Sequence, residues 1–141
     1  MEMTITPENK TANGAFCLFV RLNEMHGVKF YRTAKERNEA MALQDAAHAV
    51  ACGPAVHSTL EMAWLHSWNI PNAWDGAPKR VYGYVTDIVD VAPLSWEEYD
   101  SLKQRLKFHN IYSPDIGRRH NVGKTLSGVP IKYDFDPITN T

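Results

Sequence analysis

The chain has 141 residues and a mass of 16.0 kDa, with 44% hydrophobic and 22% charged residues, which suits one globular domain with its own core. Fifteen Lys and Arg against sixteen Asp and Glu give a net charge of −1, so no nucleic-acid partner is expected. Two cysteines, a polar N-terminus and the lack of a long apolar run argue against a disulfide framework, a secretory signal and a membrane span. The expected location is the cytoplasm.

The N-terminal part of the chain predicts two strands. Residues 1–13 are polar and are expected to form a flexible arm, with a single domain over 14–141. Apolar and β-branched residues predict strands at 15–22 and 28–32. The turn between them contains Gly27, a residue free to adopt a positive φ.

A helix is predicted over 34–52. Thr33 and Glu36 have the spacing of a capping box, in which hydroxyl and carboxylate each accept from a free amide. Glu39 borders the apolar stripe of this helix. A carboxylate there either reaches solvent or meets Lys29 of the preceding strand. A lone lysine in a strand is otherwise a solvated edge residue.

The middle of the chain combines strand signals with tryptophans. A strand is predicted over 55–62, and β-formers predict another over 80–89. Trp64 and Trp68 also have the spacing of one helical face. Together with Trp74 they form either an exposed partner surface or part of the core, because aromatic residues serve both purposes.

The C-terminal part predicts a helix and a hairpin. Ser95 and Glu98 form a second capping box, and the helix runs to Phe108. Its inward residues are expected to be Trp96, Tyr99, Leu102 and Leu106. Residues 122–135 predict a hairpin with its turn at 126–128. The fold class is therefore α+β: an antiparallel sheet with one packed helix, followed by a helix and a β-hairpin.

Side chains with oxygen atoms that can bind a metal ion lie before and after the predicted hairpin. Asp115 and Asn121 lie in the loop before it, and Asp134 lies at its end. Carboxylate and amide oxygens suit Mg²⁺, which prefers oxygen ligands and keeps several waters. The sequence therefore predicts a magnesium site typical of phosphoryl transfer.

The histidines and cysteines predict no metal centre of their own. The six histidines have no metal-ligand spacing together with cysteines. His48 and Cys52 stand one helical turn apart, which leaves open a two-ligand contact or a Cys–His nucleophile pair. Cys52 follows Ala-Val-Ala at a helix end, which favours a structural role.

The order of these segments resembles a reduced protein-kinase-like fold, in the style of aminoglycoside and choline phosphotransferases and small bacteriophage kinases. The resemblance is spread over residues 14–137. The matching segments are Gly14-Ala15-Phe16, Val28-Lys29-Phe30, Asn38-Glu39-Ala40, Gly53-Pro54-Ala55-Val56, Tyr84-Val85-Thr86-Asp87, Asp115 with Asn121-Val122-Gly123, and Asp134-Phe135-Asp136.

The resemblance implies a nucleotide site. Lys29 would contact the α- and β-phosphates of ATP and pair with Glu39, and the backbone around Thr86, Asp87 and Ile88 would meet the adenine.

It also implies a catalytic centre. Asp115 would accept the proton of the attacking hydroxyl, while Asp134 and Asn121 would each hold Mg²⁺. Positioning and charge neutralisation do most of the work in phosphoryl transfer, so these few side chains would suffice.

Departures from the family pattern indicate a degenerate member. A single glycine, Gly14, stands where a glycine-rich lid would be, Asp136 replaces the last glycine of the triplet, and most of the large lobe is missing before Thr141. The expected function is that of a pseudokinase that binds or inhibits a protein partner. A bacteriophage protein that acts on a host target would be one example of such a pseudokinase. The alternatives are an Mg-ATP-dependent phosphotransferase, completed by a partner or acting on a small molecule, and an unrelated α+β domain.

Overall fold

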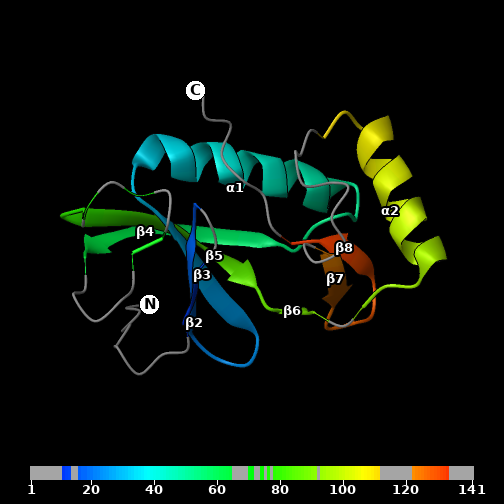
Figure 1. Cartoon of the computed structure of the whole chain (residues 1–141), viewed down its shortest axis with the longest axis horizontal. Coiled ribbons are helices and arrows are strands. Elements are labelled where there is room, and N and C mark those ends of the chain that lie inside the picture. The colour runs from blue at the N-terminus through cyan, green and yellow to red at the C-terminus, as the bar shows by residue number, and fades with distance from the viewer. Residues whose placement is uncertain are drawn as a thin grey trace.

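The computed structural model shows two antiparallel sheets, each packed against one helix (Figure 1). It describes residues 11–13, 16–64, 70–71, 74, 76, 78–91, 93–111 and 122–133. The elements are β1 (Thr11–Asn13), β2 (Leu18–Arg21), β3 (His26–Tyr31), α1 (Ala34–Ala49), β4 (Val56–Ala63), β5 (Arg80–Asp87), β6 (Val89–Asp90), α2 (Trp96–Phe108), β7 (Val122–Thr125) and β8 (Pro130–Lys132). Within these ranges, no helix has the length and apolar character needed to cross a bilayer.

The predicted α+β class is confirmed, with an antiparallel sheet, a packed helix, a second helix and a hairpin in that order. The strand expected at 55–62 is β4, and the strand expected at 80–89 divides into β5 and the short β6. Residues 11–13, expected in the arm, pair with β2 as the outermost strand.

The larger sheet has the strand order β1-β2-β3-β5-β4. α1 connects β3 to β4 and covers one face, where Ala40 packs against Tyr31 and Tyr84 (Figure 1). Side chains alternate between the two faces of a strand, so Val28 and Phe30 lie on the opposite face in the main core. β3 is therefore central and is covered on both faces.

Trp64 and Trp74 belong to this main core. Both are buried, their rings lie 5.4 Å apart, and Trp74 donates its indole N–H to the Phe16 carbonyl at 3.2 Å. Of the two alternatives, a partner surface or part of the core, the second is therefore confirmed for Trp64 and Trp74, which close the sheet face opposite α1. Trp68 lies outside the described residues.

The position of Gly27 differs from the one predicted. It lies inside β3, paired with Thr86, rather than in the preceding turn. The Phe19 ring covers its α-carbon so closely that a β-carbon would lie 2.3 Å from Phe19 Cζ. The requirement for glycine is a close approach, whereas the hairpin turn uses Gly128 at φ +94° as predicted.

Both helices begin with the predicted caps. The Ser95 hydroxyl accepts from Glu98 N, and the Glu98 carboxylate accepts from Ser95 N, a hydrogen bond that lowers the pKa of Glu98. At the other helix, Thr33 Oγ1 accepts from Glu36 N at 3.1 Å. The capping box predicted that the Glu36 carboxylate accepts from a free backbone amide, whereas it accepts from Arg32 Nε at 2.5 Å.

Both helices end in the same motif. After α1, Cys52 N donates to Ala47 O and Ala51 N to His48 O. After α2, Ile111 N donates to Leu106 O in the same way. These are Schellman caps, and the left-handed residues are Ala51 and Asn110 rather than glycine.

The second core lies between α2, the hairpin and the end of α1. Leu102 and Leu106 pack against Val122, and Tyr99 is buried beside them, as predicted. Trp96 was expected to point inward, but it is 68% exposed at the first position of α2. The Lys132 amide donates to the Cys52 carbonyl at 2.9 Å, so β8 is bonded directly to the segment that follows α1.

Candidate functional site

The predicted lysine lies at the centre of the larger sheet, beneath α1. Lys29 is only 7% exposed, and its ammonium donates to Gln44 Oε1 at 2.7 Å and to the Tyr133 carbonyl. It also lies 5.9 Å from the centre of the Tyr84 ring. The amine is thus buried within the fold, which corrects the expectation of a solvated edge lysine.

The contact expected from Glu39 is made by a different residue of α1. Glu39 is half-buried, and Gln44 reaches the Lys29 ammonium from about one and a half turns further along the helix. Its carboxamide oxygen is a neutral acceptor, so this contact differs from the ion pair that the family resemblance implies.

Gln44 is the centre of a buried hydrogen-bond network. Its Oε1 accepts from Lys29 and from the Tyr84 hydroxyl at 2.7 Å, and its Nε2 donates to Thr86 Oγ1 at 2.7 Å and Pro54 O at 3.1 Å. These four bonds use both lone pairs and both hydrogens of the amide. The network joins α1 to β3, β5 and the segment that precedes β4.

The sequence does carry a signal for this role. Gln44 stands four residues after Ala40 and three before Ala47, which places it on the inner face of the helix. Because the inner face of this helix was predicted from its apolar residues alone, the inward position of the polar Gln44 was not predicted.

The residues expected to contact adenine form hydrogen bonds with other parts of the chain. Thr86 is buried and accepts from Gln44. The Asp87 amide donates to Ala55 O at 3.1 Å, and the Ile88 amide donates to Met25 O at 2.8 Å. The two amides after Thr86 therefore bond other segments of the chain.

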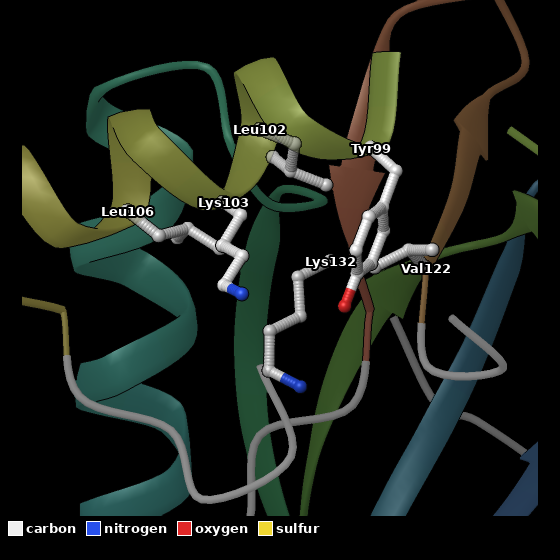
Figure 2. A pocket seen from close by; sticks show the side chains of 6 residues that line it. All are labelled: Tyr99, Leu102, Lys103, Leu106, Val122 and Lys132. Carbon is white, nitrogen blue, oxygen red and sulfur yellow. The ribbon is translucent and has the colours of Figure 1, made fainter. Parts of the chain in front are cut away.

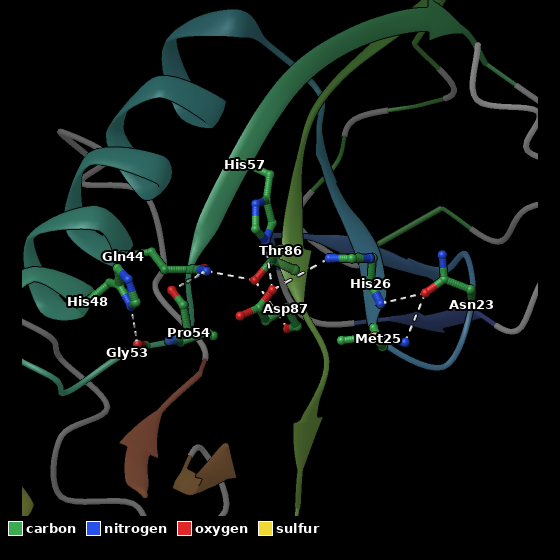
Figure 3. Close-up of polar contacts among 10 residues, drawn as sticks. All are labelled: Asn23, Met25, His26, Gln44, His48, Gly53, Pro54, His57, Thr86 and Asp87. Carbon is green, nitrogen blue, oxygen red and sulfur yellow. Dashed lines mark hydrogen bonds and ion pairs between the residues drawn. The ribbon is translucent and has the colours of Figure 1, made fainter. Parts of the chain in front are cut away.

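A second polar cluster lies at the end of the same strands (Figure 3). His57 Nε2 is 2.6 Å from Asp87 Oδ1, and His26 Nε2 is 3.7 Å from the same oxygen. The two imidazole rings are 5.0 Å apart in an edge-to-face arrangement. All three side chains are partly open to solvent, so the cluster can be reached from outside.

Sheet topology assembles this cluster. His26 and Asp87 are direct cross-strand partners of β3 and β5. On β4, one extra residue stands between the Val56–Thr86 and Thr59–Tyr84 pairs, which makes His57 part of a β-bulge. No local motif in the sequence indicates this cluster, because its three residues stand about 30 positions apart along the chain.

A shallow groove separates α2 from the hairpin (Figure 2). Leu102, Leu106 and Val122 supply its apolar wall, and the amines of Lys103 and Lys132 lie toward the same side of it. The groove is too narrow to admit a water-sized molecule. It is therefore no binding site for a nucleotide in this conformation.

Cys52 has the structural role that the sequence favours. Its thiol is buried and donates to Val50 O at 3.5 Å, while His48 Nδ1 lies 3.2 Å from Gly53 O. Burial raises the pKa of the Cys52 thiol, an effect that the nearby Arg105 guanidinium opposes. A buried thiol with a raised pKa is a poor nucleophile.

The predicted magnesium ligands and base, Asp134, Asn121 and Asp115, lie outside the described residues. Among the described residues, the structure brings Lys29 to α1 through Gln44 and places Asp87 in the histidine cluster. Protein-family models, curated proteins and solved structures were compared with the chain, and none matches it.

Proposed function

We propose that the chain is a non-catalytic, kinase-like module that acts by binding another protein. The order of its elements supports the kinase-like part of the proposal: β3 carries the lysine, α1 follows, and β4 and β5 complete the sheet. The burial and hydrogen bonds of the Lys29 ammonium support the non-catalytic part.

One observation carries the proposal: the Lys29 ammonium donates to Gln44 Oε1 and the Tyr133 carbonyl. A phosphate-binding lysine must direct its hydrogens into an open cleft. Here the ammonium is buried beneath α1, and turning it toward a nucleotide would break these hydrogen bonds. Leaving a buried polar group unsatisfied costs about 1–3 kcal/mol, so the fold opposes nucleotide binding at this lysine.

An exposed apolar surface supports the binding part of the proposal. We name it the hairpin-end surface, and it consists of Val91, Trp96, Leu126 and Val129, all of them exposed. Lys124 Nζ lies 3.3 Å from Glu98 Oε2, which holds the first turn of α2 beside β7. Exposed apolar side chains that include a large aromatic residue are typical of protein–protein contact sites.

We expect millimolar Mg-ATP to leave the melting temperature unchanged relative to Mg²⁺ alone. A ligand with a Kd of about 10 μM would add about 2.7 kcal/mol at 1 mM, which is a shift of several degrees. Differential scanning fluorimetry of the wild type and of Asp134→Ala measures this. A shift in the wild type that Asp134→Ala removes would show that the chain binds Mg-ATP, against the expectation from the buried lysine. Transfer of phosphate to an acceptor would then favour the Mg-ATP-dependent phosphotransferase, and a shift without transfer would favour a nucleotide sensor.

Photo-crosslinking tests the hairpin-end surface. With benzoylphenylalanine in place of Trp96, illumination in an extract of the source cell should yield one protein adduct. Excess unmodified chain should compete for that adduct, and excess Trp96→Ser/Leu126→Ser chain should not. The matched control carries the crosslinker at Phe108, which is 82% exposed at the other end of α2. Equal capture at both positions, or no adduct at Trp96, would contradict the proposed surface.

A further inference from the structure

The cluster of His26, His57 and Asp87 has the donor set of a transition-metal site. It offers two imidazole nitrogens and one carboxylate oxygen, one from each of the strands β3, β4 and β5. Imidazole favours Zn²⁺ and its neighbours in the first transition series, whereas Mg²⁺ and Ca²⁺ prefer oxygen ligands alone. Two histidines and a carboxylate also form the protein ligand set of one type of open zinc site.

The distances suit such an ion. Ligand bonds of about 2.0–2.1 Å in a tetrahedral site place neighbouring donor atoms about 3.3 Å apart. The two histidine nitrogens lie 2.6 and 3.7 Å from Asp87 Oδ1, on either side of that value, and the ligand atoms of all three residues lie within 4.8 Å of one another. Each of these two separations would have to change by less than about 1 Å to reach the required spacing.

The backbone beneath these side chains is held by hydrogen bonds. The Asn23 carboxamide oxygen accepts from the amides of Met25 and His26, both at 2.8 Å (Figure 3). Ile88 N donates to Met25 O, which fixes the same turn to the end of β5. Ligands that stand on ordered strands and turns need little rearrangement to bind a metal ion.

An alternative role for the cluster is a metal-free contact between imidazole and carboxylate. Exposed ion pairs of this kind contribute at most about 1 kcal/mol, so stability alone gives little reason for both imidazoles to approach one oxygen. A cation shared by all three donors accounts for that convergence.

We propose that His26, His57 and Asp87 bind one Zn²⁺ ion, with water in the remaining coordination position. The site is open because its three side chains are 36–44% exposed. It uses none of the side chains that hold the Lys29 ammonium, so its test does not depend on the proposed function. Zinc would join the ends of three adjacent strands and hold an accessible water molecule.

The test uses the full-length, untagged protein after removal of metal with a chelator. Isothermal titration with Zn²⁺ should give one site per chain, and Mg²⁺ should give no heat at this site. Substitution with Co²⁺ should produce the visible absorption of a four-coordinate ion. His57→Gln and Asp87→Asn should each weaken Zn²⁺ binding more than tenfold, because loss of even an outer-shell partner costs 10–100-fold.

His109→Gln is the matched control, since His109 is exposed at the end of α2 and should leave Zn²⁺ affinity unchanged. Circular dichroism confirms that each variant is folded. Cys17 and Cys52 are buried and do not compete for the ion in the native state. Absence of binding at 100 μM Zn²⁺, or binding unaffected by both site variants in folded protein, would overturn the proposal.

Discussion

Replacing Gln44 by alanine should lower the free energy of unfolding by about 3–5 kcal/mol, a size reached when a buried hydrogen-bond network is broken. The change removes all four hydrogen bonds of the carboxamide. The Tyr84 hydroxyl and the Lys29 ammonium would each lose an acceptor in the interior. Because desolvated groups would remain without these partners, the loss should exceed that of four surface hydrogen bonds. Urea unfolding followed by circular dichroism measures it.

Gln104→Ala provides the control for this substitution. Gln104 is also a helical glutamine, but it is exposed and donates to Asp100 at 2.8 Å on the surface of α2. Its replacement should change stability by less than about 0.5 kcal/mol. If the two variants unfold at the same urea concentration, the Gln44 network does not hold the sheet to the helix.

Gly83→Ala should destabilise the protein by about 2–3 kcal/mol, as overpacking of a tight core does. Gly83 lies in β5, directly opposite Phe30 of β3. A β-carbon at this position would lie 2.7 Å from Phe30 Cδ1 and 2.8 Å from Val28 Cγ1. Both side chains are fully buried, so neither can move aside without disturbing the core around Trp64 and Trp74. Thermal and urea unfolding measure the effect.

A double-mutant cycle with Phe30→Leu separates this clash from a general loss of strand stability. The smaller side chain leaves space for the new methyl group, so the double variant should be more stable than the sum of the two single effects by about 1 kcal/mol. Strict additivity would show that contact with the ring of Phe30 is not the cause.

The local signals in the sequence predicted the elements well. Ser95 with Glu98 fixed the start of α2, and the β-formers of 80–89 fixed β5, because capping and strand alternation depend on neighbouring residues. Burial was harder to predict. Lys29 was expected either to contact a nucleotide or to lie at a solvated edge, because a single strand contains no information about its neighbours. Only the order β2-β3-β5 with α1 above it makes β3 central.

The polar sites depended on tertiary structure in the same way. Gln44 contacts Thr86, 42 positions further along the chain, and His57 contacts Asp87, 30 positions further along. No short motif in the sequence therefore indicates either contact. The sequence left Trp64 and Trp74 open between a partner surface and the core, and the structure decides for the core because the sheet face opposite α1 needs large side chains to cover it. Trp96 was assigned to the core by helical period, although its place in the first turn of α2 leaves it open to solvent.

The irregularity in β4 also affects how the molecule behaves among its own copies. Among the strands that the structure describes, β4 is the last of its sheet and runs for eight residues, so one side of its backbone has no described strand beside it. A regular edge of that length can template further strands and seed aggregates. The bulge at His57 and Ser58 interrupts the ladder geometry, and the charged Glu61 discourages intermolecular pairing further along. The bulge that brings His57 to Asp87 therefore also helps to keep the chain from assembling edge to edge.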